Sequence, residues 1–306
     1  MELFTITIEQ IFIMLVFIAI GWMLRRFRIL PENAAAVISK LLVWVFIPAT
    51  IIKSLASNFT IANLSGKLTI LLAGVAVTVV TFIIAQPLGR FFGKNEYSKK
   101  IYTYSFVIPN TSYVGIPLLM AVFGEDMTCN MVVFTIPHML LMYTWGMYVL
   151  TNQERISLKS MNNPVMYSIG IGMILGLLGA EIPEIPATIL TNAGNCIAPC
   201  AMILAGYVVG GKPLGVSFSN GKGYLASLIR LVGLPMIIAI PMILMGIDKD
   251  VTFISVLTTA MPMGLNSIVF PEAMGQDSSE GAGMVIISTI LCIITVPVIT
   301  MLLMKL

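Results

Sequence analysis

The stretch that decides the fold reads IPNTSYVGIP and runs from Ile108 to Pro117. A second stretch, MPMGLNSIVFP from Met261 to Pro271, repeats the plan of two prolines with a glycine between them. Both lie inside apolar segments long enough to cross a bilayer. Because proline has no amide hydrogen and clashes with the preceding turn, neither segment can keep an unbroken helix. Paired breaks of this kind at membrane depth are typical of the binding site of a transporter.

Composition places the chain in a membrane. Its 306 residues are 58% hydrophobic and 10% charged, whereas soluble domains are about 25% charged. A net charge of +3 gives no reason to expect nucleic acid as a partner. We therefore expect an all-α, multi-pass protein of the cell membrane, folded as a single transporter domain over residues 1–306.

Apolar windows of bilayer length divide the chain into ten expected transmembrane helices. They cover residues 6–26, 34–56, 66–92, 98–124, 128–150, 162–180, 186–210, 222–246, 251–276 and 280–304. The loops after the first, third, fifth and seventh helix hold Arg25, Arg26, Arg28, Arg90, Lys94, Lys99, Lys100, Arg155, Lys159, Lys212 and Lys222. The opposite side holds Lys53, Lys67, Lys249 and Lys305. The positive-inside rule then predicts that both termini are extracytoplasmic.

Proline positions indicate an internal duplication. Pro48 pairs with Pro199, Pro109 and Pro117 with Pro262 and Pro271, and Pro137 with Pro297, at offsets of 151 to 160 residues. The offset is close to half the chain, which favours a first five-helix repeat over 1–150 and a second over 160–306. An odd number of helices per repeat makes the second repeat inverted. Chance coincidence is the alternative, because proline is common in membrane helices.

Two glycine pairs predict close contacts between helices. Gly172 with Gly176 and Gly206 with Gly210 form G-x-x-x-G motifs in the sixth and seventh expected helices. Small residues at this spacing let two backbones approach closely. A subunit interface is a secondary interpretation of the same motif.

Polar residues fill both breaks and are the candidate substrate-binding residues. They are Asn110, Thr111, Ser112, Asn266 and Ser267. The residues expected to shape the crossing are Pro109, Gly115, Pro117, Pro262, Gly264 and Pro271. If the breaks meet at mid-membrane, the partial positive charge of half-helix amino ends suits a carboxylate. The alternative is that these side chains only cap their own broken helices.

Glu272, His138 and Arg230 are ionisable residues within the apolar segments. Glu272 follows the second break and is a candidate site for a coupling ion, H⁺ or Na⁺, although a first-turn acid can also satisfy helix amides. His138 is a second coupling candidate, against the alternative of a hydrogen bond to a neighbour. Arg230 lies within about 12 Å of the cytoplasmic helix end, so an anchor that snorkels to the interface is preferred over an anion contact.

Enzyme motifs are absent from the sequence. A single histidine excludes H-E-x-x-H, and neither G-x-S-x-G nor a P-loop is present. We therefore expect no catalytic residues, no metal and no cofactor other than a coupling ion.

The first break resembles a known family signature. From Pro109 to Leu119 the chain reads PNTSYVGIPLL, which closely resembles the P-N-T-x-x-x-G-I-P-L-L motif of auxin efflux carriers, a family of plant PIN carriers and bacterial organic-acid permeases. The resemblance implies an elevator-type secondary carrier with crossing helices 4 and 9. It also implies a scaffold of helices 1, 2, 6 and 7, which commonly forms a homodimer, and a transport unit of helices 3–5 and 8–10. It identifies Asn110 as the substrate-binding asparagine.

The second break departs from that family. Met263 stands where plant carriers have glutamine, a plant lysine near Glu272 is missing, and so is the long loop between helices 5 and 6. These differences favour a small carboxylate such as malate, malonate or lactate over auxin. The expected function is secondary active or facilitative transport of that anion. The alternative is a ligand-sensing or regulatory membrane module of the same fold without net transport.

Overall fold

The fold was analysed in a computed structural model, which describes the chain except for residues 1, 152–155, 157, 212–220, 274–278 and 306. The described residues are helical and contain no sheet, apart from one isolated bridge between Pro109 and Met263. Six helical segments among them are long and apolar enough to cross a membrane: Ala34–Asn58, Ile61–Phe92, Thr111–Leu150, Glu184–Gly210, Gly221–Leu244 and Gly283–Leu303. The expectation of an all-helical membrane protein is confirmed.

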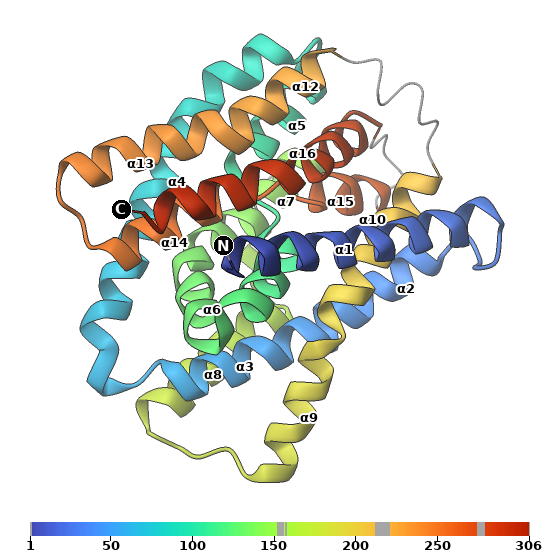
Figure 1. Ribbon diagram of the computed structural model, residues 1–306. Helices are drawn as coiled ribbons and strands as arrows, with labels where there is room; N and C mark the ends of the chain where they lie inside the picture. The colour runs from blue at the N-terminus through green and yellow to red at the C-terminus, as the bar shows by residue number, and fades with distance from the viewer. Residues whose placement is uncertain (1, 152–155, 157, 212–220, 274–278, 306) are drawn as a thin grey trace.

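The helices follow one another along the chain as labelled in Figure 1. The first half contains α1 (Glu2–Arg26), α2 (Ala34–Leu41), α3 (Ile47–Asn58), α4 (Leu64–Phe92), α5 (Glu96–Val107), α6 (Ile116–Leu141) and α7 (Met147–Leu150). The second half contains α8 (Pro164–Leu177), α9 (Glu184–Asn195), α10 (Ile197–Gly210), α12 (Gly221–Leu228), α13 (Leu234–Leu244), α14 (Lys249–Thr259), α15 (Asn266–Ala273) and α16 (Ser279–Leu303). Short 3₁₀ turns lie at Ile61–Asn63 and Leu158–Met161.

Prolines account for most of the irregular turns inside the long helices. The π-helical turns Leu42–Phe46, Thr111–Gly115 and Ile229–Gly233 each end two residues before a proline, namely Pro48, Pro117 and Pro235. A proline cannot donate to the carbonyl four residues earlier, and its ring displaces that carbonyl. The turn widens as a result. A fourth π turn, Met142–Gly146, joins α6 to α7 without a following proline.

Glycines set the two closest helix pairs, α1 with α10 and α3 with α8. A methyl group at Gly206 of α10 would overlap the Ile18 carbonyl of α1, and one at Gly176 of α8 would lie 2.5 Å from the Phe59 carbonyl oxygen at the end of α3. Figure 1 shows α1 running alongside α10. The close contacts predicted from both G-x-x-x-G motifs are confirmed, and both lie within one chain.

Helix α6 bends at Gly124, where the sequence predicts the loop between two membrane helices. Gly124 has φ +79°, a left-handed conformation that favours glycine. The next two residues are acidic and bind lysines on different helices: Glu125 binds Lys53 of α3, and Asp126 binds Lys67 of α4 at 2.9 Å. Lys67 is buried and also donates to Asn130 at 2.5 Å. These charges hold the bend of α6 between α3 and α4.

Candidate functional site at the crossing of two broken helices

The two breaks lie against each other in the interior. The end of α5 leads into the extended residues 108–110, and the end of α14 leads into residues 260–265. Pro109 and Met263 form an antiparallel bridge, in which Asn110 N donates to Pro262 O at 2.8 Å and Gly264 N donates to Ile108 O at 3.2 Å. Each break thus satisfies backbone groups of the other, which water could not do at this depth.

Small and hydroxyl-bearing residues support the crossing. A methyl group at Gly264 would lie 3.1 Å from the Ile108 carbonyl oxygen, so the two broken segments could not keep their present separation. A methyl group at Gly115 would lie 2.9 Å from the Met131 sulfur. Ser288 of α16 accepts a hydrogen bond from Met263 N at 3.1 Å and donates one to Val285 O at 3.1 Å. Pro117 begins α6 within its first two positions, where a proline is well tolerated.

Asn110 has a buried side chain that does not cap its own helix. It occupies the N-cap position of the turn Thr111–Gly115, yet its side chain makes no capping hydrogen bond, and its Oδ1 has no partner among the residues that the structure describes. The residue is 4% exposed. Its backbone carbonyl alone receives the amides of Val114 and Gly115, both at 3.2 Å. The capping alternative therefore does not account for this asparagine.

The other polar residues of the breaks behave differently. Ser267 is fully buried and donates to Gly264 O at 2.9 Å, so it caps its own break. Asn266 donates from Nδ2 to the Met142 sulfur at 2.9 Å. Thr111 is buried and Ser112 is half-buried. Of the five candidates, Asn110 is the one whose side-chain oxygen is buried at the crossing without a hydrogen-bond partner among the described residues.

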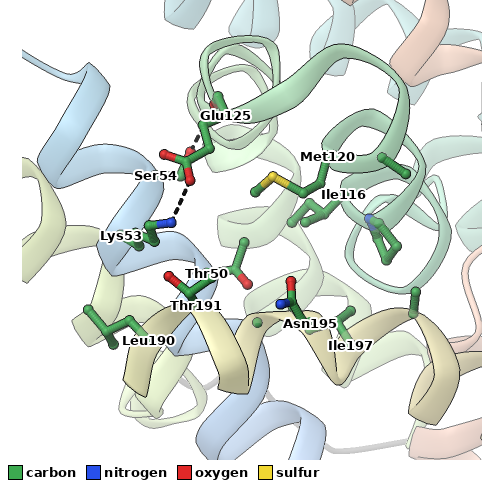
Figure 2. Close-up of a pocket in the computed structure, with 14 residues that line it drawn as sticks. Thr50, Lys53, Ser54, Ile116, Met120, Glu125, Leu190, Thr191, Asn195 and Ile197 are labelled. Carbon is green, nitrogen blue, oxygen red and sulfur yellow. Dashed lines mark hydrogen bonds and ion pairs between the residues drawn. The ribbon is translucent and has the colours of Figure 1, made fainter. Parts of the chain in front are cut away.

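A cavity of about 320 Å³ approaches the first break from the side of the Lys53–Glu125 ion pair. Helices α3, α6, α9 and α10 line it, and Ile116 and Pro117 form its wall next to the break. Its polar lining is Thr50, Lys53, Ser54, Glu125, Thr191 and Asn195. Figure 2 shows Lys53 reaching from α3 toward Glu125, with Met120 of α6 and Thr191 of α9 facing the same space. Asn110 is not among the residues that line the cavity, whereas Ile116 and Pro117, which follow the turn Thr111–Gly115, are.

The polar residues of this cavity are not among the candidates chosen from sequence. In sequence, Lys53 lies near the end of the expected helix 34–56 and Glu125 lies just after the expected helix 98–124. Their pairing depends on α3 and α6 packing together. The signal that could have found them is the acidic pair directly after Gly124, which is expected on the same extracytoplasmic side as Lys53 and Lys67. Their meeting puts both charge signs at the mouth of one cavity.

We predict that Lys53 and Glu125 are measurably coupled. Their Nζ and Oε1 atoms are 2.5 Å apart and their side chains are 22% and 39% exposed, which suggests a coupling free energy of about 0.5–1 kcal/mol. A double-mutant cycle of Lys53→Gln and Glu125→Gln, read by thermal unfolding in detergent, measures it. The control cycle uses Lys99 and Glu96, an exposed pair within α5, for which a smaller coupling is expected. Equal couplings in the two cycles would contradict the assignment.

Of the two candidate coupling residues, His138 has a described side chain and Glu272 does not. His138 is buried, and its Nδ1 lies 3.0 Å from Thr78 Oγ1. That hydroxyl donates to Gly74 O at 2.6 Å, so its hydrogen is used and His138 Nδ1 must be the donor. The hydrogen bond to a neighbour, which the sequence left as the alternative, is present. The side chains of Glu272 and Pro271 lie outside the part of the structure that is described.

Arg230 is not the interfacial anchor that the sequence predicts. The expected interfacial anchor would expose its guanidinium, but the residue is 1% exposed and donates from Nη1 to Phe106 O at 2.9 Å. The prediction of a snorkelling anchor is therefore wrong. Depth along the helix axis predicts that Arg230 can reach the interface, but α5 and α16 pack against this part of the helix and cover the side chain.

Comparison with known proteins finds relatives over nearly the whole chain. The sequence profile of the family described as "Membrane transport protein" matches residues 6–300. An uncharacterized transporter of Methanocaldococcus jannaschii is 21% identical over 297 residues, which cover 93% of this chain and 94% of the relative. An uncharacterized transporter of Methanothermobacter thermautotrophicus is 22% identical over 303 residues, covering 94% and 96%. The matched residues thus include both breaks and the residues that line the cavity.

Proposed function

The chain belongs to the membrane transport protein family, the auxin efflux carriers, and on that premise we propose that it carries a small organic carboxylate across the membrane by alternating access. It is a multi-pass transporter and not an enzyme. The proposed substrates are malate, malonate and lactate, with an auxin-like acid as a further candidate. H⁺ or Na⁺ is the proposed coupling ion if transport is active, with Glu272 as its site.

The observation that carries the proposal is the buried Oδ1 of Asn110 at the crossing, which has no partner among the described residues. A buried asparagine without partners is costly unless a ligand completes its hydrogen bonds. Rotation of the amide presents Nδ2–H, which donates to a carboxylate. The amino end of the turn Thr111–Gly115 adds amides of the same polarity. A carboxylate therefore finds hydrogen-bond donors at this break, from the turn amides and from the rotated Asn110 side chain.

An elevator-type movement of one unit past another fits the packing. The proposed scaffold contains α1–α3 and α8–α10, and the proposed transport unit contains α4–α7 and α12–α16. The cavity lies between α6 of the second group and α3, α9 and α10 of the first. The Lys53–Glu125 pair bridges the same boundary. A shift of the transport unit would break this pair and expose Asn110 through the cavity.

The ten-helix inverted repeat belongs to the same proposal. Under an inverted duplication of 1–150 onto 160–306, the first expected helix corresponds to the sixth and the second to the seventh. The contact of α1 with α10 then becomes the contact of α8 with α3, and both contacts occur. We propose that both termini are extracytoplasmic and that the scaffold forms a homodimer.

Counterflow in proteoliposomes tests the function. Vesicles loaded with unlabelled malate, malonate, lactate or indole-3-acetate are diluted into the labelled acid, and accumulation of label above equilibrium is expected for at least one. Protein-free vesicles and vesicles with an unrelated membrane protein are the controls. Binding of an acid, seen as a thermal shift, with no counterflow for any would favour the sensing module and overturn the transporter for these substrates.

A further inference from the structure

Arg230 places a guanidinium group beside the crossing. The residue lies in the π turn Ile229–Gly233 between α12 and α13 and is among the largest fully buried side chains. Its Nη1 donates to Phe106 O, while Nε and Nη2 have no hydrogen-bond partner in the described part of the chain. It makes no ion pair with any residue that the structure describes. A buried charge in this condition needs compensation from its surroundings.

The carbonyl that Arg230 binds is one that the break leaves free. In a continuous helix Phe106 O would accept the amide of Asn110, but that amide donates to Pro262 O at 2.8 Å. Pro109 has no amide for the preceding carbonyl of Ser105. Free carbonyls give the end of α5 partial negative charge. Arg230 therefore caps the end of the half-helix that leads to Asn110.

Buried polar atoms without partners concentrate on the same segments. Among the described residues they belong to Tyr104, Ser105, Asn110, Ser227, Arg230 and Thr258. These residues lie at the ends of α5 and α14, at the first break, and on the helical segment of Arg230. Buried polar groups are normally satisfied, so this concentration marks the surroundings of the crossing as the polar region of the described interior.

The position of Arg230 is one where ion-coupled carriers hold a cation. In such carriers, carbonyls at the ends of half-helices coordinate the bound ion. Here a side chain of the protein supplies the positive charge. We infer that Arg230 is the fixed counter-charge of the carried anion, moving with the crossing and balancing one carboxylate group without a sodium ion, so that of the two proposed coupling ions only H⁺ is compatible with it. The inference rests on the proposed function, and Arg230 acts through the Phe106 carbonyl as a positioning residue.

Exchange under a clamped membrane potential tests the inference. When substrate is present on both sides, only the loaded carrier crosses, so the exchange rate reports the charge of the loaded unit. Proteoliposomes with lactate on both sides are compared at zero and at about −100 mV, set by potassium and valinomycin; one charge across that full potential changes an equilibrium by about 50-fold. We expect exchange by the unmodified protein to be insensitive to potential and to replacement of sodium by choline. We expect Arg230→Gln to make exchange change several-fold with potential.

Arg230→Lys is the matched control, because it keeps the charge and should keep the insensitivity. With malate, a dicarboxylate, every variant gains one negative charge, so the glutamine variant should still be more sensitive than the lysine variant. Equal sensitivity in the two variants, or sodium dependence of the unmodified protein, would overturn the inference. Absence of any uptake would overturn the proposed function instead. If the glutamine variant does not fold, a folded but inactive lysine variant counts against the inference, and an active, insensitive one supports it.

Discussion

Asn110→Ala should weaken carboxylate binding by about 10- to 100-fold and leave the fold intact. Hydrogen bonds to charged groups contribute about 1.5–3 kcal/mol, which sets this range. The buried amide makes no capping bond and its Oδ1 is unpartnered, so its removal costs the empty protein no hydrogen bond. We therefore expect an unchanged or slightly higher Tm together with a raised KM for the acid found by counterflow. The measurements are uptake kinetics and thermal unfolding of the same preparations.

Ser267→Ala is the control from the other break. Its hydroxyl is as deeply buried but donates to Gly264 O at 2.9 Å. Removing it should lower Tm and change KM little, which is the reverse of the Asn110 result. If Asn110→Ala lowers Tm as much as Ser267→Ala and leaves KM unchanged, Asn110 is a structural residue and the site assignment fails.

The crossing could be predicted from sequence because its causes are local. A proline cannot donate an amide wherever it is placed in a helix, so Pro109 and Pro262 mark breaks without knowledge of the fold. That the breaks meet was an inference from their matching offsets, and the bridge between Pro109 and Met263 confirms it. The roles of the polar residues could not be ranked in the same way. Asn110 and Ser267 are both polar residues of the breaks in sequence, but the Ser267 hydroxyl donates to Gly264 O, whereas Asn110 Oδ1 meets no donor among the described residues.

Long side chains were harder to place than prolines. Lys53 can extend several ångströms in any direction, and its partner Glu125 lies on a helix brought close only by packing. Arg230 was assigned to the interface from its depth along the helix, although its burial depends on which neighbours cover that face. An arginine within an apolar span is a functional residue by default. Burial of the guanidinium leaves it beside Phe106 O, one of the carbonyls that the break frees.

Gly176→Ala should destabilise the protein by about 1–3 kcal/mol through overpacking, whereas Gly170→Ala in the same helix should not. An added methyl at Gly176 would lie 2.5 Å and 2.6 Å from the carbonyl oxygens of Phe59 and Leu55, which are backbone atoms of α3 and its end and cannot turn aside. Gly170 is exposed and has open space at the same position, so alanine there gains up to about 1 kcal/mol of helix propensity.

The comparison separates close packing from a general effect of alanine in α8, because the two substitutions are chemically identical and six residues apart. Thermal unfolding in detergent should give a lower Tm for Gly176→Ala and an equal or higher Tm for Gly170→Ala. Since α3 carries Thr50, Lys53 and Ser54 into the cavity, displacement of α3 from α8 should also weaken the coupling between Lys53 and Glu125. A loss of Tm without any change in that coupling would mean that α3 yields only at its end near Phe59, and that the cavity wall is held by α9 and α10 instead.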